Sequence, residues 1–242
     1  MAVGPFKILH LEDDFVAIEK PPGFHVHQPE FPRRRVPNAV VCLPNLRDQL
    51  GKYLYPVHRI DVATEGVLVF ALNKDAASFL CRQFETGEVR KTYFALVRGW
   101  VDDSGIIDRP LALDSTGELV PATTRYRTHA RVELPSAVGK RHATARYSLV
   151  EAHPESGRFH QLRRHFARIS HPLVGDTTHG DSYHNRFFRE TLGLPGLWLK
   201  AKRIEFLHPS KGTRIAIESP WGERWNSFFD KLGIQPPWEE TE

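Results

Sequence analysis

The chain has 242 residues, about twice the usual domain size, which allows one large domain or two packed ones. Hydrophobic residues make up 40% and charged residues 26% of it, a balance that excludes a disordered or fibrous protein. The longest apolar run, residues 66–72, is too short to cross a membrane, and the acidic residues 12–14 lead us to expect no signal peptide. Two cysteines without a paired spacing favour a reducing compartment, so we expect the protein in the cytoplasm.

The sequence predicts the following elements in chain order. Strands are expected at 6–11 and 15–19, a proline-rich loop at 28–45, a short helix at 46–53, a strand buried on both faces at 67–72 and a helix at 74–85. Strands follow at 89–100, around 106–107, at 123–134 and at 143–150, then a helix at 160–169. The last elements are strands at 198–207 and 213–218, a helix at 221–232 and a flexible tail at 235–242.

Strands outnumber helices and often follow one another directly. This order predicts an α+β fold built on a mixed, largely antiparallel sheet that is flanked by helices and loops. Neither a glycine-rich dinucleotide fingerprint nor a P-loop occurs, so we expect no nucleotide cofactor.

Positive charge is concentrated in one part of the chain. Residues 121–170 contain ten arginines and lysines against three glutamates, whereas the rest of the chain has a small excess of acids. Such a basic segment is typical of a surface that binds a polyanion, most often nucleic acid. A merely solvated charged face is the alternative.

The first polar cluster runs from His58 to Gly66 and leads into the buried strand at 67–72. Asp61 stands at the mouth of this strand, where a rigidly held carboxylate suits a nucleophile or a general base. Thr64 and Gly66 suit a tight turn. Ordinary turns use the same residue types, so the spacing alone leaves a purely structural role open.

The second polar cluster, residues 157–165, opens the helix at 160–169. His160, Arg164 and Arg168 share one face of this helix, whereas Arg163 points elsewhere. The run therefore predicts one surface toward phosphates and one toward a partner inside the fold. A third cluster contains Tyr93, which is either a core tyrosine or a residue that faces a cleft.

Taken together and in order, these motifs resemble those of RluA-type pseudouridine synthases. The matching residues are His58-Arg59-Ile60-Asp61 with Thr64 and Gly66, then Lys91-Thr92-Tyr93, then Gly157-Arg158 with His160-Gln161-Leu162-Arg163 and His165, then Pro172, Gly175-Asp176 and Gly180. The resemblance extends from Leu9 to about Leu232 and includes the opening Lys20-Pro21-Pro22-Gly23. It implies the pseudouridine synthase catalytic fold with a central RNA-binding cleft, as a single domain over residues 1–242 without a separate N-terminal RNA-binding domain.

The resemblance also implies a reaction and its residues. An isomerase of this family converts uridine to pseudouridine in a nucleotide that is flipped out of its helix. Asp61 is implied as the nucleophile, attacking either the ribose or the uracil ring, with Arg163 paired to it and Tyr93 packed against the target base. Arg59 is implied to fill the space that the uridine leaves. The other implied RNA-binding residues are His58, Thr64, Lys91, Arg158, His160, Gln161, Arg164 and His165.

The resemblance implies tRNA as the partner, with the uridine at position 65 as the target. It implies no cofactor, neither a metal ion nor a redox group. We expect a monomer without membrane association. Glu65 and Phe159 depart from the usual motif residues and bear on the choice of substrate. A uridine of ribosomal RNA, or another uridine of tRNA, stays open as the target.

Alternatives of other classes remain. The first is an RNA-binding protein that has lost catalysis. Such a protein is expected to have a damaged nucleophile motif, whereas Asp61, Tyr93 and Arg163 are all present here. The 13 histidines suggest a metal-dependent hydrolase, although the spacing of His160 and His165 does not place two ligands on one helical face. Residues 142–144 and 208–210 also match the short H-x-S/T pair of cyclic phosphoesterases, a pattern that arises often by chance.

Overall fold

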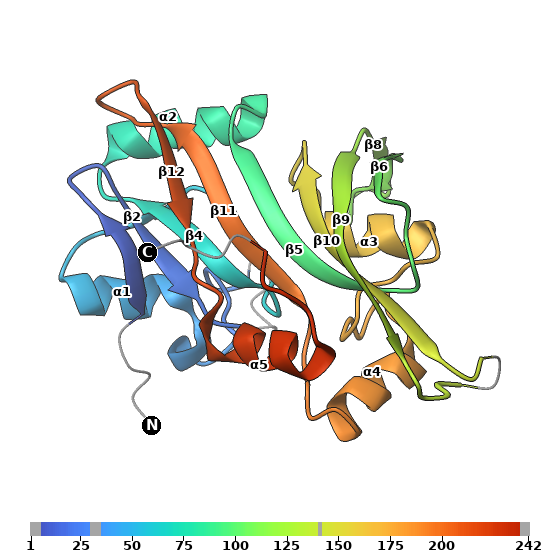
Figure 1. Ribbon diagram of the computed structural model, residues 1–242. Coiled ribbons are helices and arrows are strands. Elements are labelled where there is room, and N and C mark those ends of the chain that lie inside the picture. The colour runs from blue at the N-terminus through green and yellow to red at the C-terminus, as the bar shows by residue number, and fades with distance from the viewer. Residues whose placement is uncertain (1–5, 30–34, 140–141, 238–242) are drawn as a thin grey trace. The chain divides into compact units, whose positions relative to one another are not determined.

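The computed structural model describes residues 6–29, 35–139 and 142–237 (Figure 1). The chain divides into two compact units, the first formed by residues 1–91 and 200–219 and the second by residues 92–199 and 220–242. Among the helices described, none has the length and apolar character that a membrane span requires.

The first unit contains a mixed sheet. Its strands lie in the order β1 (Lys7–Leu11), β2 (Phe15–Lys20), β4 (Glu65–Ala71), β11 (Leu199–Leu207) and β12 (Arg214–Glu218), and the short β3 (Tyr55–Pro56) also pairs with β4. β4 and β11 are parallel, whereas the other pairs in this unit are antiparallel. The predicted mixed sheet is confirmed, and the ends of β1, β2 and β12 agree with the predicted strands within a residue.

Helices α1 (Cys42–Leu50) and α2 (Lys74–Thr86) cover opposite faces of this sheet. Alternate residues of β4 serve the two faces: Val67 and Val69 pack in the cluster of α2, and Leu68 and Phe70 pack in the cluster of α1. Because every residue of β4 is buried, the prediction of a strand covered on both sides is confirmed.

The two helices differ in how well the sequence predicts them. α2 has the predicted bounds within a residue, because Asn73 caps its start and Gly87 ends it in the left-handed region. α1 begins at Cys42, four residues before the predicted start. Pro44 lies in its first turn, where a helix needs no N–H donor, so the proline permits a helix where we expected a loop. A 3-10 turn, η2 (Asn38–Val40), precedes it, and residues 30–34 of the expected loop lie outside the described residues.

The second unit contains an antiparallel sheet in the order β5 (Arg90–Arg98), β10 (Ala145–Pro154), β9 (Thr123–Leu134) and β6 (Ser104–Asp108). β9 has the predicted bounds, and β10 continues four residues beyond its predicted end. The small hairpin of β7 (Leu111–Ala112) and β8 (Leu119–Val120) was not predicted.

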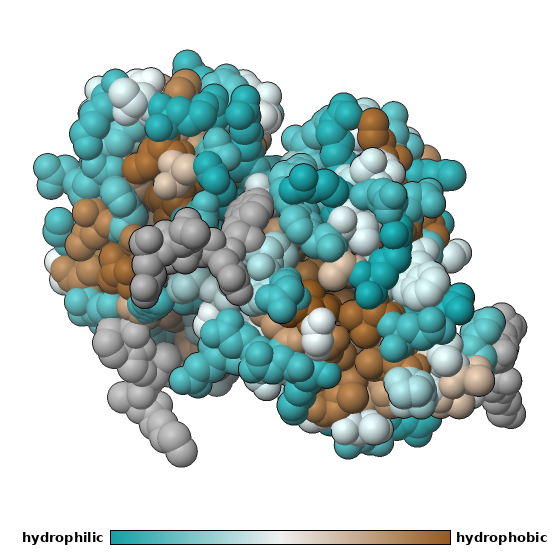
Figure 2. Space-filling view, viewed as in Figure 1, coloured by the Kyte–Doolittle hydropathy of each residue, from teal (hydrophilic) through white to brown (hydrophobic). Residues whose placement is uncertain are grey.

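Three helices pack on this sheet. α5 (Gly222–Leu232) and α4 (Ser182–Glu190) join Phe94 and Tyr147 in one cluster, and α3 (Gln161–Arg168) packs on the opposite face, where Phe166 meets Tyr126. Figure 2 shows hydrophobic side chains at the surface beside α4 and α5. The partly buried residues that pack against this core include Ala130, Leu134, Val138, Phe187 and Leu192. Of the predicted tail, residues 238–242 lie outside the described residues, and the Pro237 carbonyl accepts a hydrogen bond from Trp221.

Candidate active site

Asp61 occupies the turn between β3 and β4 in the first unit. The Thr64 amide donates to the Asp61 carbonyl at 3.0 Å, which closes the tight turn that the sequence predicts. The Asp61 side chain is partly exposed, whereas Ile60 before it and Glu65 after it are buried. The buried neighbours anchor the turn, and Asp61 keeps part of its surface exposed. Arg59, two residues before Asp61, is exposed.

The buried Lys20 is hydrogen-bonded to the backbone of this turn. The Lys20 ammonium donates hydrogen bonds to the carbonyls of Pro21, Phe24 and Val62 at 2.9, 3.1 and 3.0 Å, and the Gly23 amide also donates to Val62. Burial lowers the pKa of Lys20 to about 8, and the nearby Asp61 carboxylate opposes that shift. The residues that end β2 therefore fix the backbone directly after Asp61. Sequence reasoning gave Lys20 no role, although a lysine at the end of an apolar strand is a usable signal.

Gly66 is required by a close approach of two strands rather than by the turn. It has a φ of +121°, and a Cβ atom at this position would lie 2.1 Å from the Ala201 carbonyl oxygen of β11. Thr64 is buried, and its hydroxyl has no hydrogen-bond partner within the described residues. This hydroxyl lies three residues after Asp61 and is available to a ligand or a water molecule.

His58 and Lys91 lie in the same unit. The Val69 amide donates to His58 Nε2 at 3.0 Å, and the imidazole stacks on Phe84 with 4.6 Å between ring centroids. Burial and the positive charge of Lys91 lower the pKa of His58 to about 3, so the ring is neutral near pH 7. Burial also lowers the pKa of Lys91 to about 8. His58 therefore packs against β4 and α2, and its predicted contact with RNA stays a prediction.

Arg163 is the central side chain of the second unit's candidate site. It is buried on α3, and its Nε and Nη2 atoms each donate to the Asp176 carboxylate at 2.7 Å. Asp176 also accepts the amides of Thr178 and His179. Burial raises the pKa of Asp176, but these donors outweigh burial and lower it below its ordinary value, so the carboxylate is ionised. The prediction that Arg163 points away from the face of Arg164 is confirmed; sequence reasoning gave Asp176 no role.

Two other predicted site residues, Gln161 and His165, are buried residues of α3 itself. Gln161 donates to the Thr123 carbonyl and to the Thr124 hydroxyl. His165 has one ring nitrogen 3.0 Å from the Arg109 carbonyl and the other 2.9 Å from the Thr124 hydroxyl. Burial lowers the pKa of His165, which keeps the ring neutral. These hydrogen bonds connect α3 to β9, and the predicted RNA contacts of Gln161 and His165 stay predictions.

The remaining predicted residues of this unit lie nearer the surface. Tyr93 is partly exposed on β5, opposite Ala152 of β10. Arg158 and Arg164 donate to the carbonyls of Pro121 and Ala112. His160, the N-cap residue of α3, has a left-handed backbone, and its Nδ1 atom lies 3.1 Å from Nε2 of His179.

In the structure, ion pairs neutralise much of the positive charge of the basic segment, residues 121–170. Its three glutamates all pair with its own arginines, and two aspartates outside it pair with two more; the pairs are Arg125–Glu155, Arg127–Glu151, Arg146–Glu133, Arg131–Asp103 and Arg163–Asp176. Arg158, Arg164 and Arg168 instead donate to carbonyls and have no acid within 4.0 Å among the described residues. Unneutralised positive charge is therefore gathered on α3 and the turn before it, while Lys140 and Arg141 lie outside the described residues.

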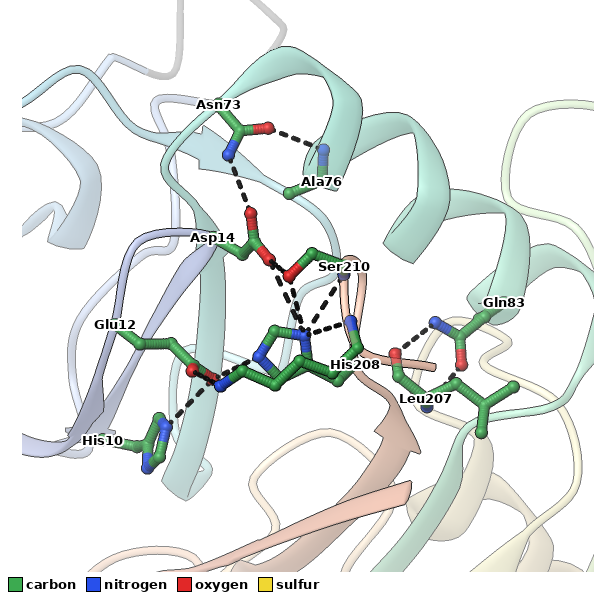
Figure 3. A network of polar contacts seen from close by, with 10 residues as sticks. His10, Glu12, Asp14, Asn73, Ala76, Gln83, Leu207, His208 and Ser210 are labelled. Carbon is green, nitrogen blue, oxygen red and sulfur yellow. Dashed lines mark hydrogen bonds and ion pairs between the residues drawn. The ribbon is translucent and has the colours of Figure 1, made fainter. Parts of the chain in front are cut away.

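The histidines suggested as metal or phosphate ligands have other surroundings. His208 is buried 2.9 Å from Glu12, and its Nδ1 atom accepts the amide of Ser210, whose hydroxyl bonds to Asp14 (Figure 3). These contacts connect the β1–β2 turn to the β11–β12 turn within the first unit. Within the described residues, no group of three or more histidines, cysteines and acids is arranged to hold a metal ion.

Comparison with known proteins identifies the family of the chain. The RNA pseudouridylate synthase family matches residues 14–168. A tRNA pseudouridine synthase C from Vibrio cholerae serotype O1 is 40% identical over 97% of this chain and 97% of its own length, and one from Yersinia pestis is 39% identical over 98% and 95%. The chain belongs to the RNA pseudouridylate synthase family.

Solved structures agree with this membership at the level of the fold. Human RNA Pseudouridylate Synthase Domain Containing 4 matches with a TM-score of 0.71 at 23% identity, over 96% of this chain and 94% of that protein. Human RNA Pseudouridylate Synthase Domain Containing 1 matches with a TM-score of 0.68 at 24% identity, over 89% and 83%. The predicted family, its α+β fold and the enzyme class, an isomerase, are confirmed.

Proposed function

We propose that this RNA pseudouridine synthase isomerises a uridine of tRNA, the one at position 65. The observation that carries the proposal is the similarity to tRNA pseudouridine synthase C proteins over nearly the whole length of both chains. We further propose that residues 1–242 form one catalytic domain with a central RNA-binding cleft, that it acts as a monomer in the cytoplasm, and that its loops select the RNA.

Asp61 is the proposed nucleophile. The reaction breaks the bond between N1 of uracil and C1′ of ribose, rotates the base and joins C5 to C1′; C5 loses a proton and N1 gains one, so no atom is lost. A carboxylate is suited to hold the anomeric carbon or the uracil ring during the rotation. The partial exposure of Asp61 and its fixed backbone support this role. The pairing of Arg163 with Asp61 stays a prediction from the family resemblance.

The other proposed roles concern the RNA. The target uridine has to leave its helix, which costs stacking and pairing energy. The exposed Arg59 is proposed to enter the RNA where the uridine has left, and Tyr93 to pack against the flipped base. Arg158, Arg164 and Arg168 are proposed to contact phosphates, because their charge is not cancelled by nearby acids.

The test is pseudouridine mapping by carbodiimide adducts and primer extension on unfractionated tRNA and on ribosomal RNA. Both RNA samples, prepared without this modification, are incubated with the protein in the presence of a chelator. We expect one new stop, at tRNA position 65. A stop at another position or in ribosomal RNA would keep the reaction and replace the substrate, whereas no stop in any RNA would favour the inactive RNA-binding protein.

A further inference from the structure

Phe159 is an exposed aromatic residue in the turn before α3, two residues before the first residue of that helix. Phe159 has 42% of its surface exposed. Its ring stacks on the His160 imidazole with 3.8 Å between ring centroids and 20° between ring planes. One face of the phenyl ring is therefore covered by a second flat ring. The exposure of Phe159 leaves the remaining ring surface open to solvent.

His160, whose ring supports Phe159, has a strained backbone conformation. His160 has a φ of +52°, in the left-handed region that residues with side chains rarely adopt. Its Nδ1 atom lies 3.1 Å from Nε2 of His179, and the His179 amide donates to Asp176, the partner of Arg163. Such strain persists only where surrounding contacts impose it, and it is often found at binding sites. These contacts therefore connect the Phe159 ring to Arg163 through a short series of hydrogen bonds.

Two arginines flank the stacked rings. Arg158 precedes Phe159, and Arg164 Nη1 donates to the Phe159 carbonyl at 3.3 Å. Neither guanidinium has an acid within 4.0 Å among the described residues; both donate instead to neutral carbonyls, at Pro121 and Ala112. Proteins hold unpaired nucleotides with an exposed aromatic ring and nearby cations, since the base stacks on the ring and the phosphates are attracted to the cations.

We infer that Phe159, backed by His160, is a stacking platform for one unpaired base of the RNA substrate other than the target uridine. Arg158 and Arg164 contact the phosphates on either side of that base. The inference rests on the proposed function for its RNA, and it makes Phe159 a specificity-determining residue: the platform favours an RNA in which a base near the target is unpaired or easily unstacked.

The experiment measures RNA binding separately from catalysis. Phe159→Leu, which keeps apolar bulk without a flat ring, and Phe159→Trp, which keeps the ring, are each combined with Asp61→Ala. Phe79→Leu on α2, where the native phenylalanine is 37% exposed, is the matched control. Binding to unfractionated tRNA and to a short, fully paired RNA duplex is titrated, and the fluorescence of Phe159→Trp is compared with that of the unchanged protein.

We expect Phe159→Leu to weaken tRNA binding between about 5- and 150-fold, the range of one base–aromatic stack. Phe159→Trp should stay within about 3-fold of the unchanged protein and show new indole quenching by tRNA, while Phe79→Leu and all duplex affinities stay unchanged. Unchanged tRNA binding by Phe159→Leu, no quenching, or an equal loss on the duplex would overturn the platform. Failure of the proposed function appears separately, as an absence of pseudouridine with the unaltered protein.

Discussion

The Arg163 guanidinium is joined to the Asp176 carboxylate by two hydrogen bonds of 2.7 Å, and both side chains are buried. A paired, doubly bonded guanidinium has a fixed plane and a permanent charge. Asp176 is itself fixed by the amides of Thr178 and His179. The loop at 176–179 therefore determines the orientation of the arginine that the family resemblance assigns to the nucleophile.

Replacement of Asp176 by asparagine tests this positioning role. The change keeps the size of the side chain but removes the charge, so the buried Arg163 loses the carboxylate that binds it through two hydrogen bonds. We expect a loss of about 3 to 5 kcal/mol in the free energy of unfolding. We also expect turnover to fall on the order of 100-fold, with the Kd for tRNA within about 3-fold of the original.

Asp181→Asn provides the control for that variant. Asp181 pairs with Arg98 in the same unit but is partly exposed, and asparagine preserves its role as the cap of α4. This variant should lose at most about 1 kcal/mol and keep its turnover. Equal effects of the two substitutions on turnover would show that Asp176 contributes only to stability.

The neutralised arginines predict an unequal contribution to RNA binding. Arg164→Gln and Arg168→Gln each remove a charge that no nearby acid cancels, so each should reduce the slope of log Kd against log salt by about 0.7 to 0.9. Arg125→Gln and Arg127→Gln remove charges already paired with glutamates and should change the slope less. The measurement is tRNA binding at several potassium chloride concentrations. Equal slopes for all four variants would contradict the unequal distribution of charge.

Gly66→Ala should destabilise the first unit strongly. The added methyl group meets the Ala201 carbonyl at 2.1 Å in a backbone conformation that alanine disfavours, and we expect a loss of roughly 3 kcal/mol or more. Gly51→Ala, at a φ of +61° with open space around it, should lose only about 1 kcal/mol. Urea unfolding of both variants measures the difference, and similar losses would mean that the strand approach is not restrictive.

The acidic network in Figure 3 predicts a pH dependence of stability. Burial raises the pKa of Glu12, but contacts with Lys211, His208 and His10 outweigh burial and lower it from 4.5 to about 2. A lowered carboxylate pKa stabilises the folded state at pH values above the unfolded pKa, and this contribution is lost as the pH falls through the folded value. Stability should therefore decrease between about pH 5 and pH 2.

Glu12→Gln identifies the source of that decrease. The variant should be less stable than the original protein at pH 7, and the difference should shrink as the pH falls toward 2. Glu223→Gln, at an exposed glutamate of α5 outside the network, should leave the profile unchanged. The free energy of urea unfolding is measured at each pH. A constant difference between Glu12→Gln and the original protein would contradict the assignment.

Local patterns predicted most of the fold because they depend on neighbouring residues. β9 and α2 carry a clear alternation, a cap or a stop signal, and the structure places them as predicted. α4 has no such pattern: its only buried residue is Phe188, so no apolar period marks it, and the cap at Asp181 was the one available signal. α1 was predicted too late because Pro44 was interpreted as a loop residue.

The candidate site was predictable only where one segment contains the information. Helical spacing separated Arg163 from Arg164, and turn chemistry placed Asp61 before a buried strand. The contact of Arg163 with Asp176 joins two segments, and no local rule relates them. The pairing of Arg127 with Glu151 depends on the register of β9 against β10, which includes a bulge and which the sequence does not specify.

Asp61→Asn, measured for pseudouridine formation and for tRNA binding side by side, tests the proposal that Asp61 is the nucleophile. The substitution keeps the shape of the side chain and removes the nucleophilic carboxylate. We expect no detectable pseudouridine and a Kd for tRNA within about 3-fold of the original, because the proposed phosphate contacts lie on other residues. Pseudouridine formation at the original rate would contradict the proposal, and so would the loss of tRNA binding together with activity.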